Sequence, residues 1–264
     1  MAVGRKKRIR VLQLSDPHLA ADRNADYRGQ NADDNLRSLL PAARTWDPDL
    51  VLLTGDVSED ASRASYARAA VMLGTIGAPV LALPGNHDDP DEMKRHFPLG
   101  PWQGPFAREA GAWLIVLMDS TARGRIAGSF SQEYLERFDR LLRGSRAESV
   151  LVALHHQPVP AGAPWIDRYP LEQAQRFLDF IDRDRRVRCV VWGHIHHDYR
   201  AERKGVRLLG APSAVANSLP KTPVFTLDLD GPAGRWLELG AAGAVGTGVI
   251  RAAGLVIEPG DGAG

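Results

Sequence analysis

Cysteine, net charge and long apolar runs are all scarce in this chain of 264 residues. Its single cysteine, Cys189, cannot form an internal disulfide, and its place in the apolar run 187–192 indicates a buried small hydrophobic residue. We therefore expect a reducing, cytoplasmic location. The 33 Lys and Arg residues nearly balance the 32 Asp and Glu residues, so the formal net charge is only +1. This balance excludes the broad positive field that attracts nucleic acids or anionic membranes.

The basic start of the chain does not lead into a long apolar segment. Residues 4–10 read GRKKRIR, but only the apolar run 11–14 follows before Ser15. A secretion signal needs about 7–15 apolar residues and a membrane span about 20, so we expect neither. We interpret residues 1–8 as a solvated basic arm, with a phosphate-binding arm as the alternative.

The residues that are present, 44% hydrophobic and 25% charged, have the proportions of a soluble globular protein. Short apolar runs alternate with amphipathic segments, which predicts a layered α/β fold. The runs are apolar on both faces, as strands in a covered sheet are. Ser131 is a favoured N-cap, and Pro170 is suited to a first helical position. Expected strands are 10–14, 50–54, 80–83, 113–118, 150–154 and 189–192, and expected helices are 32–45, 62–74, 132–143 and 171–184.

After Tyr199 the pattern changes to short apolar runs separated by Gly, Pro and Asp. The runs 206–209, 224–229 and 235–239 predict a final antiparallel meander, with a further strand at 245–250. The Gly-rich stretch 252–264 is expected to be a mobile tail. Because there is neither an internal repeat nor a long linker, we expect residues 1–264 to form one domain with a core of about 9–251.

Histidines and carboxylates gather directly after five of the expected strands. The segments are SDPH (15–18), GD (55–56), PGNHD (84–88), HH (155–156) and GHIHH (193–197), and they hold seven of the eight histidines. The carboxyl ends of strands are where α/β sheets place ligand sites. Each segment alone fits a hydrogen-bonded turn. Five together at one edge would bury unsatisfied polar groups unless a cation bound them.

The kinds of side chain limit which metal fits. Imidazole and carboxylate without thiolate suit Mn, Fe, Co, Ni or Zn, and they fit neither a Cys-rich structural zinc site nor an all-oxygen calcium site. Seven candidate ligands are too many for one tetrahedral ion, so we expect two divalent ions that share a carboxylate. The candidates are Asp16, His18, Asp56, Asn86, His155, His194 and His196.

These segments also resemble a known family. The blocks DxH (16–18), GDxxxD (55–60), GNHD (85–88), HH (155–156) and GHxH (193–196) stand in the order of the five motifs of the calcineurin-like metallophosphoesterases. Within that superfamily the chain is similar to the class III 3',5'-cyclic nucleotide phosphodiesterases, the bacterial cyclic AMP branch. The closer likeness lies in TGD (54–56), LPGNHD (83–88), LHHQPVP (154–160), WID (165–167), GHIH (193–196) and APS (211–213).

The resemblance implies a four-layer αββα sandwich, in which two mixed β-sheets are flanked by helices and a dinuclear site lies between their strand ends. It implies that Asp56 bridges two ions, usually Fe, Mn or Zn in the family. His87 matches a histidine that faces the substrate phosphate without binding metal. The implied ligands are Asp16, His18 and His196 for one ion, and Asn86, His155 and His194 for the other.

The implied activity is hydrolysis of a 3',5'-cyclic nucleotide, first of all cyclic AMP to 5'-AMP, by attack of a metal-bridging hydroxide on phosphorus. As the catalytic residue, His87 would donate a hydrogen bond to the phosphoryl oxygens or protonate the departing 3'-oxygen. The implied substrate-binding residues are His18, Asp56, Asn86, His87 and His196.

Two other readings of the function stay open. One is a broader phosphodiesterase acting on glycerophosphodiesters or 2',3'-cyclic nucleotides, and the other is a non-catalytic interaction scaffold of the same fold. A nuclease is disfavoured by the balanced charge, so we expect no nucleic-acid and no membrane partner. The resemblance allows a homodimer.

The remaining polar and aromatic residues near these motifs carry weaker expectations. Asp60 and Asp88 are expected to orient metal ligands, with turn capping as the alternative for Asp88. Strand neighbours point to opposite faces, which disfavours a direct substrate role for the histidines that flank candidate ligands. The flanking histidines are His156 and His197. His96 is expected on the surface. Trp165 and Tyr169 are expected to pack a loop, with stacking on a purine as the alternative.

Overall fold

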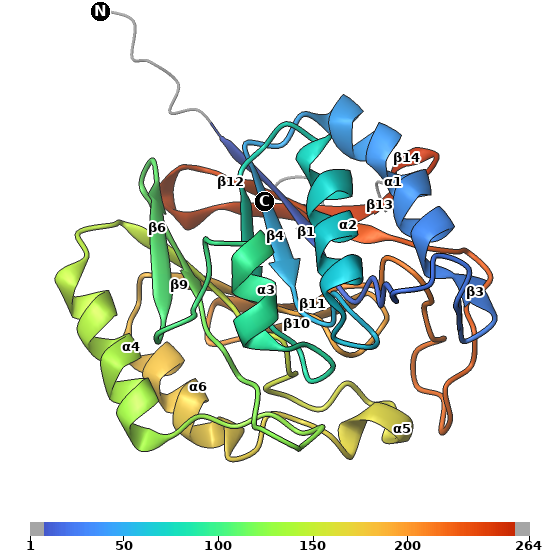
Figure 1. Cartoon of the computed structure of the whole chain (residues 1–264). Helices are drawn as coiled ribbons and strands as arrows, with labels where there is room; N and C mark the ends of the chain where they lie inside the picture. The colour runs from blue at the N-terminus through green and yellow to red at the C-terminus, as the bar shows by residue number, and fades with distance from the viewer. Residues whose placement is uncertain (1–7, 257–264) are drawn as a thin grey trace, which may run out of the picture.

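Two mixed sheets of six strands each form the centre of the computed structural model, which describes residues 8–256 (Figure 1). The first sheet has the order β14-β13-β12-β1-β4-β5, and the second has the order β10-β11-β9-β8-β7-β6. The strands of the first are β1 (Ile9–Leu14), β4 (Leu50–Thr54), β5 (Val80–Leu83), β12 (Gly234–Leu239), β13 (Val245–Arg251) and β14 (Gly254–Val256). Those of the second are β6 (Phe106–Ala110), β7 (Trp113–Leu117), β8 (Ser149–Ala153), β9 (Val187–Trp192), β10 (Tyr199–Arg203) and β11 (Val206–Gly210).

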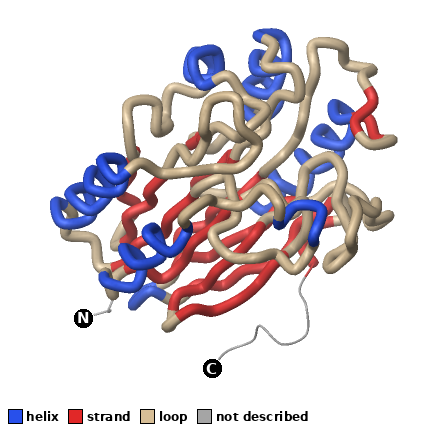
Figure 2. Tube along the Cα trace, turned by 90° about the horizontal axis from the view of Figure 1, so that it is seen from below, coloured by secondary structure: helices blue, strands red, loops and turns tan. Residues whose placement is uncertain are grey.

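Helices cover the outer face of each sheet, so that the strands lie between helices on opposite sides (Figure 2). One apolar cluster joins the first sheet to its helices, a second joins the second sheet to its helices, and a third lies between the two sheets. The expected four-layer αββα sandwich is therefore confirmed. The helices of the first sheet are α1 (Ala32–Trp46), α2 (Arg63–Gly74) and α3 (Pro90–His96), and those of the second are α4 (Gln132–Gly144), α5 (Pro164–Asp167) and α6 (Ala174–Arg183). A small hairpin, β2 (Asp26–Tyr27) with β3 (Gln30–Asn31), and the 3₁₀ turn η1 (Ala241–Gly243) complete the elements.

The central strands are apolar on both faces because each face meets a different layer. In β9, Cys189 and Val191 belong to the cluster between the sheets, whereas Val190 and Trp192 belong to the cluster under the helices. This alternation follows from the two-residue period of a strand. Burial raises the pKa of the Cys189 thiol to about 12, so the prediction of a buried small hydrophobic residue is confirmed.

Most of the expected boundaries agree with the structure to within two residues. Ser131 caps α4 as expected, because its hydroxyl accepts a hydrogen bond from the Tyr134 amide at 3.1 Å. The expected start of the fourth helix at Leu171, after Pro170, is wrong, since α6 begins at Ala174. The amides of Leu171 and Glu172 instead donate to the carbonyls of Gln157 and Gly128, which holds this segment as a loop.

The expectations for the end of the chain need three corrections. The segment 224–229 is no strand, and Val224 and Leu229 are exposed. The predicted single meander is divided between the sheets: β11 pairs parallel with β9, whereas β12, β13 and β14 form an antiparallel meander in the first sheet. The expected mobile tail at 252–264 starts too early, because residues 254–256 form β14. Residues 257–264 and most of the expected basic arm lie outside the described residues.

Elements that the sequence did not predict are short or half-exposed. The edge strands β6 and β10 read FAREA and YRAER, and charged residues interrupt any apolar pattern in them. Charged side chains are a usual way to protect an edge strand from pairing with another chain. No helix of the described chain is long and apolar enough to cross a lipid bilayer.

The side chain of Arg235 ties the two sheets together. Arg235 lies in β12 and is fully buried, yet it forms an ion pair with Asp198 and donates to the Gly210 carbonyl at 2.8 Å, both in the other half of the sandwich. It also donates to Thr247 Oγ1 at 2.9 Å. A buried charge is tolerated only where such partners satisfy it.

The Arg235→Leu variant is expected to unfold about 5–10 °C lower, because loss of hydrogen bonds to a charged group costs about 2–3 kcal/mol. Thermal unfolding followed by circular dichroism measures the change. The matched control is Arg143→Leu, which removes an exposed ion pair on α4 and should cost under about 0.5 kcal/mol. Equal melting temperatures for the two variants would contradict the structural role given to Arg235.

Candidate metal centre

Parallel strands direct five loops to the same end of the sandwich. In the first sheet β1, β4 and β5 run parallel, and in the second β8 and β9 run parallel. The loops after these strands carry the expected ligands, whose nitrogen and oxygen atoms lie within 4.8 Å of one another in overlapping groups. The groups are Asp16, His18 and His196; Asp16, Asp56 and His155; His18, Asp56 and His87; and His155, His156 and His194. Asn86 joins them, with its Oδ1 3.3 Å from His155 Nε2.

Five of the expected ligands stand at strained backbone positions. Each has a positive φ, which costs a non-glycine residue about 1–3 kcal/mol and is concentrated at functional sites. Backbone hydrogen bonds between the loops hold two of them: the amides of Asp16 and His18 donate to the carbonyls of Gly55 and Asp56 at 3.0 Å. The φ angles are 52° at Asp16, 45° at His18, 48° at Asp56, 67° at His194 and 53° at His196.

Two glycines let the loops approach closely enough to form the cluster. A Cβ at Gly193 would collide with the side chains of Ser15 and Asp16, and a Cβ at Gly85 would collide with Asp56. The glycines of the motifs around the expected ligands therefore make room for the carboxylates.

His18 and His196 turn their Nε2 atoms towards each other. The Nδ1 of His196 donates to the Ala216 carbonyl at 2.8 Å, and the Nδ1 of His18 lies 2.7 Å from the Glu59 carboxylate. These contacts turn the two Nε2 atoms towards each other, at a separation of 3.3 Å. Two ligands bound about 2.0–2.2 Å from one ion stand about 3–3.5 Å apart, so a cation fits this pair.

His155 meets two oxygens in the same way. Its Nδ1 donates to the Thr54 carbonyl at 2.8 Å, and its Nε2 lies 3.3 Å from both Asn86 Oδ1 and Asp56 Oδ2. Burial alone would lower the pKa of His155, but the Asp56 carboxylate raises it to about 9. Positive charge is therefore favoured at Nε2, and either a proton or a metal ion can supply it.

Asp56 stands between the two sets of ligands. Its Oδ2 is 3.8 Å from His18 Nε2 and 3.3 Å from His155 Nε2, while its Oδ1 accepts a hydrogen bond from the His87 amide at 2.9 Å. Burial would raise the pKa of Asp56, but His155 and His18 hold the pKa of this carboxyl well below its usual value. A carboxylate that stays charged between two histidine-containing sets has the position and the chemistry of a bridging ligand.

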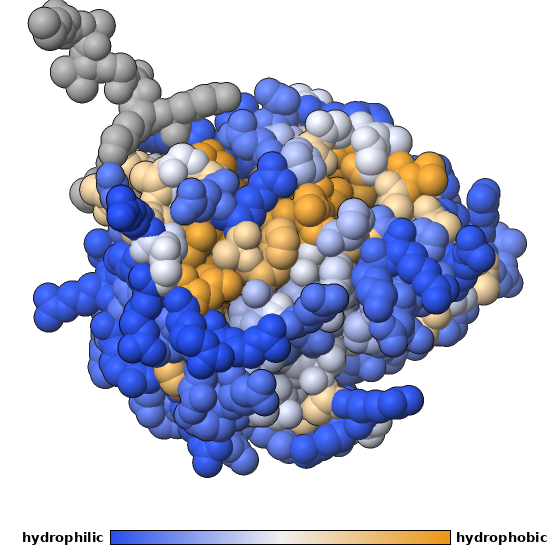
Figure 3. Space-filling view, turned by 60° about the vertical axis from the view of Figure 1, so that its left-hand side comes forward, coloured by the Kyte–Doolittle hydropathy of each residue, from blue (hydrophilic) through white to orange (hydrophobic). Residues whose placement is uncertain are grey.

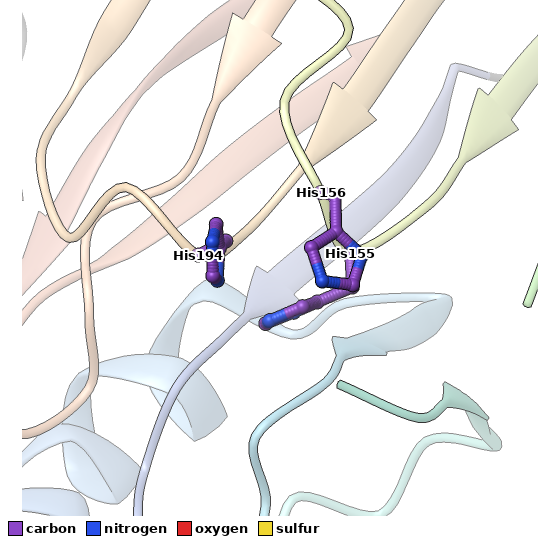
Figure 4. Close-up of side chains that lie close together, drawn as sticks. All are labelled: His155, His156 and His194. Carbon is purple, nitrogen blue, oxygen red and sulfur yellow. The ribbon is translucent and has the colours of Figure 1, made fainter. Parts of the chain in front are cut away.

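The ring of His194 lies beside His155, with 4.9 Å between the centroids (Figure 4). Its Nε2 donates to the Tyr169 carbonyl at 3.1 Å, which leaves Nδ1 as the free acceptor. Burial, and then the neighbouring His155, lower the pKa of His194 to about 3, so the ring is neutral, as a metal ligand must be.

His156 lies next to these rings but has no free nitrogen. Its Nε2 donates to the Ile126 carbonyl at 2.8 Å, and its Nδ1 accepts from the Ser120 hydroxyl at 2.8 Å. His197 is also buried and its Nδ1 donates to the Ile195 carbonyl. Neither ring lines the pocket over the metal ligands, in agreement with the low expectation for a substrate role.

Three further expectations about polar residues are corrected. Asp60 and Asp88 are expected to orient ligands by accepting imidazole or amide hydrogen bonds, but their donors include loop amides and no ring of an expected ligand. The turn-capping alternative for Asp88 is therefore the right one. The donors are Ala21 and Ser62 for Asp60, and Val57, Ser58 and Gly85 for Asp88. His96 is only partly on the surface: its side chain is 18% exposed and stacks on Tyr66.

The residue that does orient ligand rings is Glu59, which the sequence analysis missed. Its Oε2 lies 2.7 Å from His18 Nδ1 and 3.2 Å from His87 Nδ1. Its position beside Asp60 was visible, but the sequence offers no way to tell which of two adjacent carboxylates turns inward. Through Glu59 the expected ligand His18 and the expected catalytic His87 share one anchor.

The Glu59→Gln variant is expected to bind Mn²⁺ about 10–100-fold more weakly, because a neutral amide supports the basicity of His18 less than a carboxylate does. Isothermal titration of the metal-stripped protein with Mn²⁺ measures the change. Glu109→Gln, an exposed carboxylate of β6, is the matched control and should leave the affinity unaltered. Unchanged affinity in Glu59→Gln would contradict the anchoring role.

A cavity of about 380 Å³ opens over the cluster. Five of the seven expected ligands line it, namely His18, Asp56, Asn86, His194 and His196. Three other segments contribute Tyr27, Arg28, Trp165, Tyr169 and Phe225. Tyr27 stacks on His18 at 4.1 Å between centroids, and its hydroxyl is 3.1 Å from His18 Nε2. Trp165 lies edge to face with His196, with 6.2 Å between the ring centroids. It packs against the cluster under the second sheet and also lines the pocket.

A larger cavity, of about 620 Å³, lies at the opposite ends of the strands. Its lining includes Ile9, Trp113 and Leu239 and contains no histidine. Figure 3 brings forward the side of the molecule that carries β6 and shows apolar surface gathered there among hydrophilic surface. Of these two cavities only the smaller one is lined by histidines, which lie there beside Asp56 and Asn86, so its side chains and not its size make it the candidate functional pocket.

Comparison with known proteins agrees with this geometry. Over 256 residues, covering 95% of this chain and 92% of the relative, the sequence is 34% identical to a protein of Pseudomonas aeruginosa named 3',5'-cyclic adenosine monophosphate phosphodiesterase CpdA. A protein of the same name from Escherichia coli K12 is 34% identical over 96% of this chain and 93% of its own. A dimetal phosphatase from Danio rerio shares the fold, with a TM-score of 0.66 over 90% of this chain and 98% of its own at 15% identity. Residues 9–198 match the family described as calcineurin-like phosphoesterase, and the chain belongs to that family.

Proposed function

We propose that the protein is a two-metal phosphodiesterase that hydrolyses 3',5'-cyclic nucleotides, above all cyclic AMP to 5'-AMP. The observation that carries the proposal is the buried Asp56 carboxylate between His18 and His155, which belong to two separate ligand sets. The substrate comes from the names of relatives that match this chain over more than nine tenths of their length.

Asp16, His18 and His196 would hold one divalent ion, and Asn86, His155 and His194 would hold the other, with Asp56 shared. The ligand atoms fit, because imidazole nitrogens and carboxylate and amide oxygens converge at separations of 3.3–3.8 Å. When bound, two such ions neutralise phosphoryl oxygens and lower the pKa of a water that serves as the nucleophile.

The protein side chains supply the remaining functions. The two carboxylates, Asp16 and Asp56, only partly cancel the charge of two dications, so the site attracts a phosphodiester monoanion. His87 is exposed at the pocket, with 37% of its side chain accessible, and its ring is held at Nδ1 by Glu59. This turns Nε2 towards the substrate, and the doubly protonated ring would donate from Nε2 to a phosphoryl oxygen or to the departing 3'-oxygen. The side chains nearest the substrate would be His18, Asp56, Asn86, His87 and His196.

The alternative readings differ in what they predict. A broader phosphodiesterase, acting on glycerophosphodiesters or 2',3'-cyclic nucleotides, would keep the same ions but show no preference for cyclic AMP. A non-catalytic scaffold would not require a complete ligand set, a charged buried Asp56 and a histidine held beside them. The complete set favours catalysis over the scaffold.

The test uses chelator-stripped protein to which Mn²⁺ or Fe²⁺ is added back. Its substrates are 3',5'-cyclic AMP, 3',5'-cyclic GMP, 2',3'-cyclic AMP and bis(p-nitrophenyl) phosphate. We expect metal-dependent release of 5'-AMP from the first with the highest kcat/KM. Hydrolysis of the p-nitrophenyl diester without hydrolysis of either 3',5'-cyclic nucleotide would overturn the proposal, and inactivity towards all four would favour the scaffold.

Iron and manganese are the proposed metals, with zinc as the alternative, and metal analysis of the purified protein tests this choice. A cytoplasmic location is proposed because the chain has a single, buried cysteine and so needs no oxidising compartment. The proposed assembly is a homodimer acting on small cyclic nucleotides, without nucleic-acid or membrane partners. Sedimentation analysis of the metal-loaded protein measures the assembly.

A further inference from the structure

Three side chains that line the pocket belong neither to the expected metal ligands nor to the catalytic histidine. They are Arg28 from the β2–β3 hairpin, Trp165 from α5, and Phe225 from the irregular segment that the sequence analysis took for a strand. All three line the cavity that contains the metal ligands.

Arg28 stands where the hairpin would favour another residue. The two turn residues, Arg28 and Gly29, have φ angles of 54° and 80°. A two-residue turn with both φ angles positive prefers Asn-Gly or Gly-Gly, because side chains other than Asn and Asp are strained there. An arginine at this place therefore calls for a role of its side chain and not of its backbone.

The guanidinium of Arg28 lies against the Phe225 ring, near two further aromatic rings, and has no carboxylate partner among the described residues. Its Cζ lies 4.0 Å from the Phe225 ring centroid and 5.7 Å from that of Trp165. Its one hydrogen bond among the described residues runs from Nε to the Tyr27 hydroxyl at 3.3 Å. One face of the guanidinium is thus occupied by Phe225, while the residue as a whole is exposed at the pocket.

The rim beside this layered pair is apolar. Val224 and Ile126 both line the pocket and are 63% and 47% exposed, which is unusual for large apolar side chains next to a charged site. A flat, partly apolar group would cover them. The Tyr27 hydroxyl links the metal ligands to this rim, since it lies 3.1 Å from His18 Nε2 and accepts a hydrogen bond from Arg28 Nε at 3.3 Å.

We propose that Arg28, backed by Phe225, is the specificity-determining residue for the nucleoside: the base stacks on the open face of its guanidinium. Arginine planes and aromatic rings are the surfaces on which proteins stack unpaired bases. The inference rests on the proposed function for the phosphate end of the ligand. It names the residues that would distinguish a nucleotide from a simple phosphodiester. It also accounts for the exposed apolar rim, which the base would cover.

The test measures binding and not turnover. Isothermal titration of Mn²⁺-reconstituted full-length protein with 5'-AMP and with inorganic phosphate gives the contribution of the nucleoside as the ratio of the two affinities. In the unmodified protein we expect 5'-AMP to bind at least about tenfold more tightly than phosphate. Arg28→Met and Phe225→Leu are each expected to weaken 5'-AMP binding about tenfold and to change phosphate binding less than about twofold.

Two further variants separate stacking from charge and from folding. Arg28→Lys keeps the charge but loses the plane, so it is expected to behave like Arg28→Met. Arg23→Met removes an exposed arginine that precedes the hairpin, five residues before Arg28, and should match the unmodified protein. Full 5'-AMP affinity in Arg28→Lys would overturn the stacking proposal, as would equal loss of 5'-AMP and phosphate affinity in Arg28→Met. Tight 5'-AMP binding that needs Arg28, in a protein that does not hydrolyse cyclic AMP, would sink the proposed function and leave this inference standing.

Discussion

The Asp56→Asn variant is expected to lose more than about a thousandfold in kcat/KM for cyclic AMP and to bind fewer than two divalent ions per chain. The exchange keeps the size of the side chain and an oxygen that can accept from the His87 amide. It removes the negative charge that lies between His18 and His155. Because each of two ions would depend on that one carboxylate, both sites weaken together.

Metal content by plasma emission and steady-state hydrolysis of cyclic AMP measure the two effects on the same samples. The matched control is Asp60→Asn, four residues further along, whose carboxylate accepts hydrogen bonds from loop amides and touches no expected ligand. We expect it to retain two ions and turnover within about threefold. Two bound ions and near-normal turnover in Asp56→Asn would show that Asp56 does not bridge.

The positions of the expected ligands could be predicted because they depend on strand ends. A run such as 150–154, apolar on both faces, fixes a strand in a covered sheet, and the next residue must lie at its carboxyl edge. His155 follows directly from that rule. Its neighbour His156 could be set aside for the same reason, since adjacent side chains leave a strand in opposite directions.

Residues on irregular loops could not be placed in this way. Glu59 and Asp60 are neighbours of the same charge, and only the path of the loop turns one to His18 and the other to backbone amides. Phe225 lies in an apolar run that has the composition of a strand. Its ring packs beside Trp165 and Arg28 in the pocket wall, and one isolated bridge is the only strand-like pairing of this segment. Tertiary contacts of this kind override local propensity.

The helix expected at 171–184 shows a smaller effect of the same cause. The prediction used the preference of proline for a first helical turn, which concerns only the local chain. In the structure the amides that would start that turn are already paired with two other loops, so α6 begins later. One of those loops leads directly from His155, and the site thus helps to set the boundary of the helix.

The His87→Ala variant is expected to lower kcat for cyclic AMP by about a hundredfold to ten-thousandfold while two ions remain bound. His87 has no place in the ligand pairs that face each other at about 3.3 Å, and its ring is fixed by Glu59 at 3.2 Å instead. Removing it should therefore leave both ions bound and take away a proton donor or a hydrogen bond at the substrate. His96→Gln, which alters a histidine outside the pocket, is the control and should keep wild-type kcat.

Comparison of two substrates decides which of two actions His87 performs. The 3'-oxygen of a ribose leaves as a strong base and needs a proton, whereas p-nitrophenolate leaves without one. If His87 protonates the leaving group, His87→Ala should lose at least about tenfold more activity on cyclic AMP than on bis(p-nitrophenyl) phosphate. If His87 donates a hydrogen bond to the phosphoryl oxygens, both substrates should lose by the same factor, because the charge on those oxygens develops in either reaction. Unaltered kcat on both would remove His87 from the mechanism and leave the bound ions as the whole of the catalytic apparatus.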